Sequence, residues 1–429
     1  MKLRYLLAGV AATAFAASVV AQVPYVPQVV QIGPTDLFQD VVGGAPQAQN
    51  FYATSAQIGT YGQTLDGGNY DNAIIGGDFS TNLFQRGTSV GSITTTATYT
   101  ADRWIAWSGA ATTLTVTQQT GATDIPVGYN ASLRVNKGSG AGVVQACIAQ
   151  EVETTASLRF QGKTAELDFL AKAGSGFSAA NSNLQVSIVY GTGTDEGTSK
   201  LAFAFNGGGG GSSTWTGQTN AASNLLVPIN TAWNRYTIAA AIPSTATEVA
   251  AIICYTPVGT GTANDWFEFT GVQLTPNQAL TPLVGTAGVV LSANDLRAKS
   301  FARRPQQMET ALQQRYFLSF TEPATGVTVG QGVLTSTTTC NAIIPFPVPM
   351  RIAPVTGGVT FTGTALSTST WRIQDSTTST LASTFLVFST ASPNNLALTA
   401  TLTTASTAGW VCQLQGVAGG SIINVSSEL

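Results

Sequence analysis

Apolar and polar residues alternate in short runs along most of this chain. Residues 184–190 carry an apolar side chain at every second position, and residues 114–117, 166–170 and 266–269 show a similar alternation. A period of two places the apolar side chains on one face of a strand. Glycine, asparagine, threonine and serine separate the runs, as they do at turns. The pattern predicts a mainly β protein built from sandwiches of short strands.

Residues 305–316, with the sequence PQQMETALQQRY, break this pattern. Met308, Leu312 and Tyr316 recur at every fourth position, which places them on one face of a helix. Pro305 suits the first position of a helix. We therefore predict one short helix, with a narrow apolar stripe that needs a partner.

Four segments follow from these patterns. Residues 1–70 hold four scattered prolines after an apolar start and predict an extended arm. Residues 71–277 predict a first β-sandwich. Residues 278–316 form a connector with the short helix. Residues 317–429 return to threonine-rich alternation and predict a second, smaller β domain.

The first 22 residues, MKLRYLLAGVAATAFAASVVAQ, have two interpretations. Lys2 and Arg4 precede an apolar run that ends near Ala21, which is the pattern of a cleaved signal peptide. A retained apolar segment that packs against other subunits of an assembly fits equally well. The first interpretation implies secretion, and the second implies an anchor.

Charged residues make up only 9% of the 429 residues, and the net charge is −3. A surface of this kind shows no basic stripe, so we expect no nucleic-acid partner. Low surface charge works against solubility unless the surface is covered. A tight, symmetric homo-oligomer would cover it.

The chain has no histidine, which removes Ser-His and Cys-His nucleophile pairs and imidazole metal ligands. The four cysteines form no CxxC pair, so a zinc site is not expected. Two interpretations stay open for them: disulfides joining Cys147 to Cys254 and Cys340 to Cys412, or four buried thiols that act as small hydrophobic residues.

Several motifs, taken in order, resemble a family of bacteriophage tail and head fibre proteins. They are NAIIGGDF at 72–79, FQRGT at 84–88, YTADRW at 99–104, GVQL at 271–274, FARRP at 301–305, QRY at 314–316, FPVPMR at 346–351 and SEL at 427–429. The resemblance covers residues 72–429. The stretch between residues 274 and 301 is longer than in such proteins, so the placement of the two β domains is not carried over.

The resemblance implies that the first sandwich is a jelly roll similar to carbohydrate-binding modules. It also implies a structural protein of the virion, a homotrimer held to other virion proteins through residues 1–70. The projecting β domains would contact host-surface polysaccharide. A structural calcium near the opening and closing strands is a further implication, and Asp78 and Glu268 are its candidate ligands. No other cofactor is expected.

Two tryptophans are candidate carbohydrate-binding residues, because sugar faces stack on exposed aromatic rings. Trp215 follows the glycine run at 207–211, and Trp371 lies among threonines and serines. Packing against neighbouring loops is the alternative for both. For the triplet Asp102, Arg103 and Trp104 we predict structural roles, with Trp104 in the core and Arg103 paired locally.

We expect no enzymatic activity. A polysaccharide-degrading fibre would need two carboxyl groups about 5–10 Å apart. The adjacent Asp195 and Glu196, and Glu151 with Glu153 on one strand face, are the available pairs, and neither has an aromatic platform beside it. The alternatives to a virion fibre are a secreted bacterial carbohydrate-binding protein and such a depolymerase.

Overall fold

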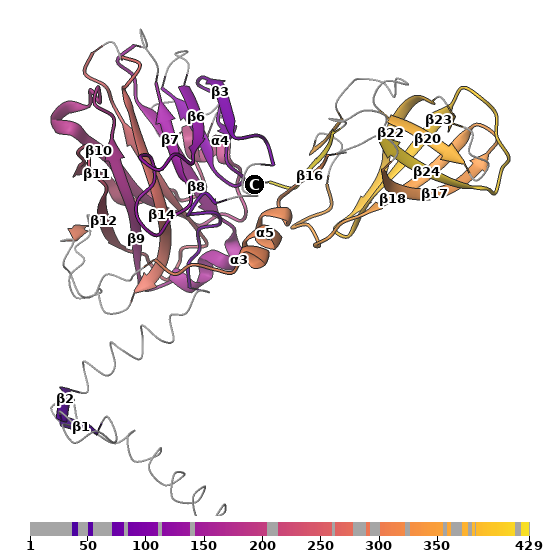
Figure 1. Cartoon of the computed structure of the whole chain (residues 1–429). Helices are drawn as coiled ribbons and strands as arrows, with labels where there is room; N and C mark the ends of the chain where they lie inside the picture. Colours follow the sequence, from indigo (N-terminus) through magenta and orange to yellow (C-terminus); the bar gives the residue numbers. More distant parts are fainter. Residues whose placement is uncertain are drawn as a thin grey trace, which may run out of the picture. The chain divides into compact units, whose positions relative to one another are not determined.

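The computed structural model describes residues 37–41, 50–54, 71–80, 85–109, 114–137, 142–203, 213–259, 262–277, 289–291, 301–321, 327–354, 358–361, 371–375, 380–381, 383–416 and 422–428. The chain divides into two compact units, Met1–Gly68 and Asn69–Leu429 (Figure 1). In the first unit, β1 (Leu37–Val41) pairs antiparallel with β2 (Asn50–Thr54). The remainder of the predicted arm, including the apolar start, lies outside the described residues.

The second unit begins with two antiparallel sheets that face each other. One sheet has six strands in the order β11-β10-β13-β8-β5-β4, and the other has seven in the order β15-β12-β9-β14-β7-β6-β3. The strands are β3 (Ser89–Ile93), β4 (Thr98–Tyr99), β5 (Ile105–Ser108), β6 (Leu114–Gln119), β7 (Ser132–Asn136), β8 (Ala146–Val152), β9 (Thr164–Ala173), β10 (Asn183–Gly191), β11 (Thr219–Pro228), β12 (Asn234–Ala241), β13 (Glu248–Tyr255), β14 (Trp266–Asn277) and β15 (Val289–Leu291). The predicted mainly β class is confirmed.

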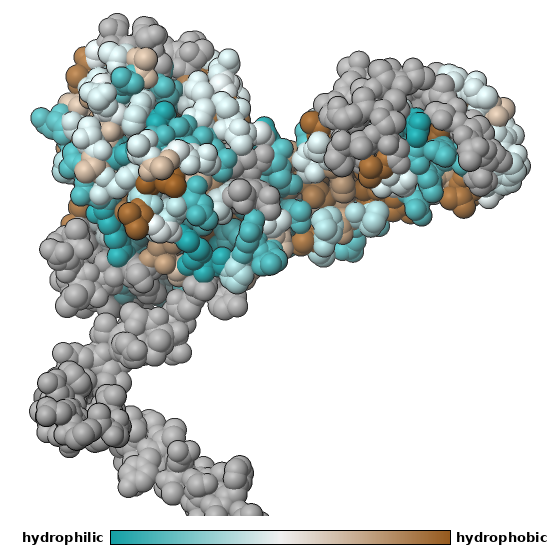
Figure 2. Space-filling view, viewed as in Figure 1, coloured by the Kyte–Doolittle hydropathy of each residue, from teal (hydrophilic) through white to brown (hydrophobic). Residues whose placement is uncertain are grey.

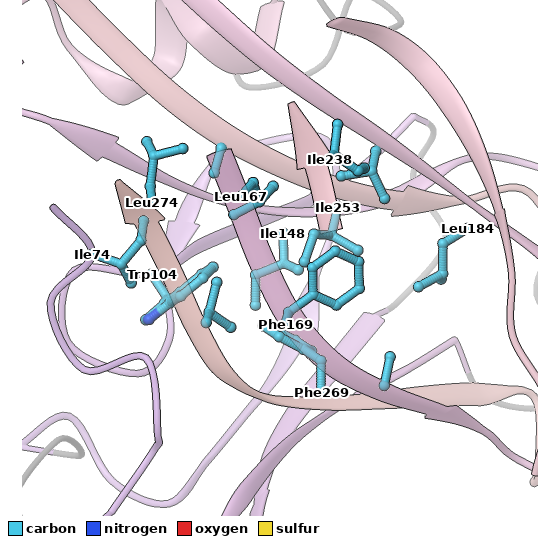
Figure 3. Close-up of a cluster of buried hydrophobic side chains, with 14 of the residues drawn as sticks. Ile74, Trp104, Ile148, Leu167, Phe169, Leu184, Ile238, Ile253, Phe269 and Leu274 are labelled. Carbon is cyan, nitrogen blue, oxygen red and sulfur yellow. The ribbon is translucent and has the colours of Figure 1, made fainter. Parts of the chain in front are cut away.

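The first hydrophobic core lies between these two sheets. Leu167 and Phe169 of β9 point inward at every second position, as the alternation predicts. Trp104 is 1% exposed and packs its ring against Phe79 and Phe269 at centroid distances of 5.4 and 5.5 Å. Figure 3 shows this cluster with contributions from both sheets. The predicted core position of Trp104 is therefore correct.

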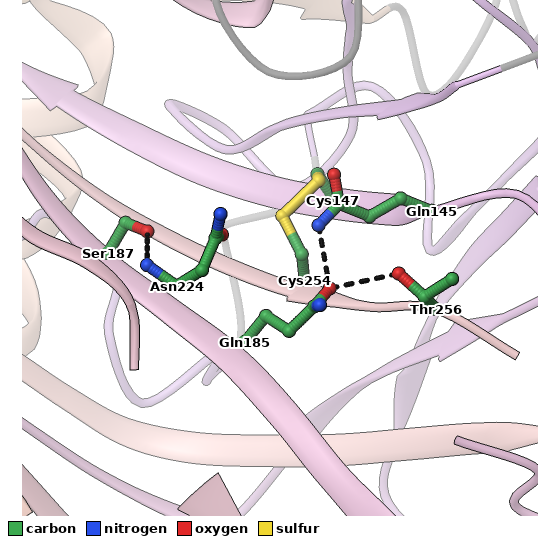
Figure 4. The surroundings of a disulfide bond; sticks show 7 residues. All are labelled: Gln145, Cys147, Gln185, Ser187, Asn224, Cys254 and Thr256. Carbon is green, nitrogen blue, oxygen red and sulfur yellow. Dashed lines mark hydrogen bonds between the residues drawn. A yellow bond between two sulfur atoms is a disulfide. The ribbon is translucent and has the colours of Figure 1, made fainter. Parts of the chain in front are cut away.

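The outer face of the six-stranded sheet carries a smaller cluster of buried residues. Leu201 and Ala202 of the short helix α4 (Thr198–Phe203) pack there with Trp107 and Trp215. A disulfide joins Cys147 of β8 to Cys254 of β13, which are paired in register (Figure 4). The chain's own side chains therefore cover this part of the outer face.

The ends of the first sandwich are tied together across about 200 residues. The Asn72 side-chain oxygen accepts hydrogen bonds from the backbone N–H of Ile74 at 2.9 Å and of Leu274 at 3.0 Å. Gly77 lies so close to β14 that a Cβ there would stand 2.0 Å from the Val272 carbonyl oxygen. A glycine is required at this contact.

Helix α5 (Gln306–Gln314) follows the connector. Pro305, the residue directly before it, is its N-cap. The predicted helix is confirmed. A still shorter helix, α3 (Thr154–Ser157), follows β8. Among the described residues, no helix has the length and apolar character needed to cross a membrane.

A second core lies between two further antiparallel sheets, ordered β16-β25-β19 and β21-β20-β24-β17-β18-β23-β22. A disulfide joins Cys340 to Cys412, so both sequence-suggested pairings are present and the alternative of free thiols is wrong. The strands are β16 (Phe317–Thr321), β17 (Thr328–Ser336), β18 (Thr339–Pro345), β19 (Val359–Phe361), β20 (Trp371–Asp375), β21 (Thr380–Leu381), β22 (Ser383–Ser392), β23 (Asn395–Leu402), β24 (Val411–Gly416) and β25 (Ile422–Ser426).

Candidate functional site

The two candidate carbohydrate-binding tryptophans, for which packing was the alternative, are buried. Trp215 and Trp371 are each 2% exposed. Trp215 packs on the outer face of the six-stranded sheet and donates its Nε1–H to the Glu196 carbonyl oxygen at 3.1 Å. Trp371 lies in the second core. The exposure that the loop-like flanking residues suggested is wrong for both, because distant strands cover the rings.

The two proposed calcium ligands have different partners. Glu268 is fully buried, and its carboxylate contacts the Arg134 Nε at 2.6 Å and the Lys172 Nζ at 2.9 Å. Burial raises the pKa of Glu268, and these two cations oppose the rise. Asp78 instead accepts a hydrogen bond from the Ser80 hydroxyl at 3.0 Å. In the part of the chain that the structure describes, no group of three or more acidic or cysteine side chains could hold a metal ion.

Asp78 lines a cavity of about 220 Å³ between the opening segment of the first sandwich and the connector. Its lining is mostly polar and combines a carboxylate, a hydroxyl, amides and a guanidinium with an aromatic ring. The residues are Asn72, Gly77, Asp78, Ser80, Asn130, Phe301, Ala302, Arg303, Arg304, Gln306 and Glu309. The cavity brings together two segments that are more than 200 positions apart in the sequence.

Phe301 and Arg303 line one side of this cavity, and Tyr129 packs against both of them from behind. The Phe301 ring lies 5.7 Å from the Tyr129 ring, centroid to centroid. Arg303 stacks over Tyr129 at 5.1 Å and donates to the Gly128 carbonyl oxygen at 2.7 Å. The Arg303 side chain is still 46% exposed and lies 3.6 Å from Asp78. It can therefore reach a ligand while its position is held.

The two other charged residues of the cavity, Arg304 and Glu309, are engaged in contacts that stabilise the fold. Arg304 donates to the Ile74 carbonyl oxygen at 2.9 Å and pairs with Glu309 at 2.9 Å. Glu309 also accepts the backbone N–H of Gly76. These contacts tie the start of α5 to the opening segment. Asp78, Asn130 and Arg303 remain as the polar groups that face the cavity and can bind a ligand.

Sequence reasoning placed Asp78 near a site but missed the residues that complete it. Phe301 and Arg303 belong to the FARRP motif, which lies in the segment predicted to be a connector. Asn130 lies in a loop without a motif. The only signal for Phe301 and Arg303 was an aromatic residue and two arginines at the entrance of a predicted helix.

A second cluster of polar residues lies where α5 and the end of β25 meet the first sandwich. Arg103 was expected to pair locally, but it contacts Glu428 at 2.5 Å, the Glu151 carbonyl oxygen at 2.9 Å and the Tyr316 ring at 3.9 Å. Arg86 reaches Glu428 as well, at 3.3 Å. The prediction that Arg103 pairs with a residue near it in the sequence is wrong, because its partners come from distant parts of the chain.

The carboxyl groups considered for hydrolysis lie around this cluster. β8 ends at Val152, so Glu153 does not share a strand face with Glu151, and it pairs with Arg315 at 3.1 Å. Glu151 is 2% exposed and borders a cavity of about 150 Å³. Burial raises its pKa to about 8, while Arg103 lowers it.

The second pair considered for hydrolysis is also engaged with cations. Asp195 contacts Arg351 at 2.9 Å, and Glu196 contacts Lys200 at 2.6 Å. Three of the four carboxylates considered for hydrolysis therefore form ion pairs, and the fourth, Glu151, is buried.

Comparisons with known proteins show only distant likenesses. No family model and no curated protein matches the sequence. The enzymatically active domain of tailspike protein 4 from bacteriophage CBA120 aligns with 48% of this chain and 22% of its own, at 13% identity and a TM-score of 0.28. The chain thus spans about a fifth of that tailspike domain.

Two carbohydrate-binding structures align in the same way. A CBM4 module aligns with 36% of this chain and 74% of its own, at 18% identity and a TM-score of 0.22. The CBM22-1-CBM22-2 tandem of Xyn10C from Paenibacillus barcinonensis aligns with 77% of this chain and 95% of its own, at 7% identity and a TM-score of 0.25. These TM-scores are all below 0.5, so they assign neither a family nor a function.

Proposed function

We propose that this chain is a non-enzymatic structural fibre protein of a bacteriophage virion, and that its first sandwich binds glycans of a bacterial surface. The cavity beside Asp78 is the observation that carries the glycan-binding part. Its ring, carboxylate, amide and guanidinium are the groups that stack on a sugar and hydrogen-bond its hydroxyls. The tail or head position and the homotrimer come from the resemblance of the motifs at 72–104 and 301–316.

The proposal of a binding protein rather than a hydrolase has its own support. General acid–base hydrolysis needs two carboxyl groups flanking an accessible bond. Glu153, Asp195 and Glu196 are engaged with cations, and Glu151 is 2% exposed. Incubation with host capsule or lipopolysaccharide should release no reducing ends. Their release would support the depolymerase alternative.

Binding can be tested with the full-length protein on an array of bacterial surface polysaccharides, followed by titration of the best fragment. Phe301→Ala and Asn130→Ala should each weaken binding at least about tenfold, because each removes a group that faces the sugar. Asn220→Ala is the matched control, since it removes an exposed amide from β11 of the same sandwich. Equal binding by all three variants, or no binding by the wild type, would contradict the proposal.

The position in a virion needs a separate experiment. Mass spectrometry of the natural protein distinguishes a mature start at Gln22, which favours a secreted carbohydrate-binding protein, from an intact start. Cross-linking in intact particles should join residues 1–70 to a portal, tail or capsid protein. Cross-links from the two β domains alone would contradict attachment through the arm.

A further inference from the structure

The cavity beside Asp78 has equal numbers of positive and negative groups in its lining. Asp78 and Glu309 are carboxylates, and Arg303 and Arg304 are guanidinium groups. Arg304 and Glu309 pair with each other at 2.9 Å, and their side chains are only 5% and 13% exposed. Their charges are therefore offset within the chain, which leaves Asp78 and the exposed Arg303 as the charged pair that a ligand meets.

Asp78 and Arg303 are close to each other without forming a hydrogen bond. The Asp78 Oδ2 and the Arg303 Nε are 3.6 Å apart, whereas N–H···O hydrogen bonds are about 2.7–3.2 Å long. The other carboxylate oxygen, Oδ1, accepts the Ser80 hydroxyl at 3.0 Å. One oxygen atom can bridge a polar gap of this length, as water does in many contacts. A sugar hydroxyl is suited to this position, because it can donate to the carboxylate and accept from the guanidinium.

A charged sugar fits this pair less well than an uncharged one. The carboxylate of an acidic sugar on Arg303 would also lie near Asp78, and like charges at short distance repel. An ammonium group on Asp78 would meet Arg303 in the same way. Asn130 is exposed and adds an amide, which donates and accepts without a charge. An uncharged sugar with adjacent hydroxyls can therefore bond all three groups.

The surroundings of the cavity do not favour an acidic ligand either. Charged residues make up only 9% of the chain and its net charge is −3, so no excess of positive charge attracts an acidic glycan from a distance. Figure 2 shows hydrophilic residues spread over the visible face of the first sandwich. The low content of charged residues means that most of the polar side chains in this protein are uncharged.

The size of the cavity limits the length of the ligand. Its volume is about 220 Å³, and pockets for drug-sized ligands are about 300–1,000 Å³. This volume suits one sugar ring better than a chain of several. Among the residues that line the cavity, Phe301 supplies the one aromatic ring, on which one sugar ring can stack. A ring at the end of a glycan or on a side branch can enter such a cavity, whereas a ring inside a linear chain has a neighbour on each side.

We propose that this cavity binds one uncharged sugar ring, at the end or on a side branch of a glycan, through adjacent hydroxyls that bridge Asp78 and Arg303. The choice of ligand rests on the glycan-binding function proposed above and narrows it to one class of sugar. Asp78 is the acceptor and Arg303 the donor, and uronic acids and other acidic sugars are excluded as the residue in the cavity.

Pairs of methyl glycosides that differ only at the sixth carbon test the charge of the ligand. The full-length protein is titrated with the methyl glycosides of the uncharged hexoses in the polysaccharide that it binds best, and at least one should bind. The matching methyl uronoside, in which a carboxylate replaces the group at the sixth carbon, should bind at least about tenfold more weakly. A uronoside that binds as tightly as its neutral counterpart would overturn the proposal.

Asp78→Asn tests the acceptor. It keeps the oxygen that Ser80 contacts and removes the charge, so it should weaken binding of the neutral glycoside at least about fivefold and reduce its preference over the uronoside. Asp124→Asn is the matched control, since it removes the same charge from another loop of the first sandwich, where Arg134 and Lys172 keep Glu268 as a partner. A preference that Asp78→Asn leaves unchanged, or that Asp124→Asn changes as much, would overturn the role of Asp78.

A longer ligand tests the size of the site and separates this inference from the proposed function. An oligosaccharide that ends in the bound sugar should bind within about tenfold of its methyl glycoside, because one ring makes most of the contacts. A much tighter oligosaccharide, or binding of polysaccharides without binding of any methyl glycoside, would overturn the single-ring ligand and leave glycan binding in place. No binding to any glycan would contradict the proposed function itself, and this inference with it.

Discussion

The Arg103 guanidinium and the Glu428 carboxylate meet at 2.5 Å although 325 positions separate them in the sequence. Their side chains are only 1% and 5% exposed. Glu428 follows β25 of the second sandwich, and the Tyr316 ring lies beneath the guanidinium. This contact between the two sandwiches is therefore a buried ion pair.

Replacing Arg103 with methionine should lower the free energy of unfolding by about 3 kcal/mol, because buried Glu428 then keeps only the longer contact with Arg86. The double variant, Arg103→Met with Glu428→Met, should recover part of this loss. Denaturant titration of the three proteins measures the effect. Arg303→Met is the matched control, since an exposed arginine should change stability by less than about 1 kcal/mol. Equal losses for the two arginines would contradict a special role for Arg103.

Glu151 makes stability depend on pH. Burial raises its pKa from 4.5 to about 8, so between these values the folded chain holds a proton that the unfolded chain has released. This contribution to stability is complete below the unfolded pKa and is lost as pH rises through about 8. Glu151→Gln keeps the neutral form and should unfold with a free energy higher than the wild type by on the order of 5 kcal/mol at about pH 9.

The two proteins should differ little at about pH 5, where Glu151 is protonated in the folded wild type. Asp102, whose pKa burial raises to about 7, adds the same slope to both proteins and cancels in the comparison. A difference that is independent of pH would show that Glu151 stays charged in the folded chain.

The disulfide of the second sandwich should hold that sandwich together. Its cysteines are 72 positions apart, and closing a loop of that length stabilises a fold by about 4 kcal/mol in the chain-entropy account. Cys340→Ser with Cys412→Ser should therefore lower the thermal midpoint of the second sandwich. Differential scanning calorimetry of the wild type and of the double variant measures this midpoint. An unchanged midpoint would show that packing alone, without the disulfide, stabilises the second sandwich.

Gly332 should be intolerant of any side chain. It pairs with Cys412 on one side and Ala342 on the other, and a Cβ there would stand 1.7 Å from the Asn341 carbonyl oxygen. Gly332→Ala should cost several kcal/mol or prevent folding, because β17 would have to move away from β18. Gly259→Ala, with nothing within 4 Å of its Cβ, is the control and should unfold like the wild type.

The sequence predicted the strands and the linking helix because both show a regular spacing of apolar residues. Alternation at 184–190 corresponds to β10, and the four-residue spacing of Met308, Leu312 and Tyr316 corresponds to α5. The three prolines of residues 343–349 favour an edge or a connecting segment, because proline has no N–H to donate inside a central strand. Ile343 to Pro345 instead end β18, an inner strand, where the last residue tolerates proline.

The candidate site could not be predicted in the same way. Local composition suggested that Trp215 is exposed, yet α4 and the six-stranded sheet cover it. Asn130 and Phe301 become neighbours only after the first sandwich closes and the connector returns to its opening segment. The domain boundaries, calcium binding and the absence of enzymatic activity remain predictions.

The bond between Asn72 and Leu274 has a consequence for the time course of synthesis. Their hydrogen bond spans 202 positions. At roughly 5–20 residues per second, a ribosome needs roughly 10 to 40 s to add that many. For that interval the first sandwich lacks the end of β14, which lies between β9 and β7 in the seven-stranded sheet, and the apolar faces of these strands are exposed to other nascent chains. Rapid translation or chaperone cover during this interval should therefore decide how much of the protein escapes aggregation.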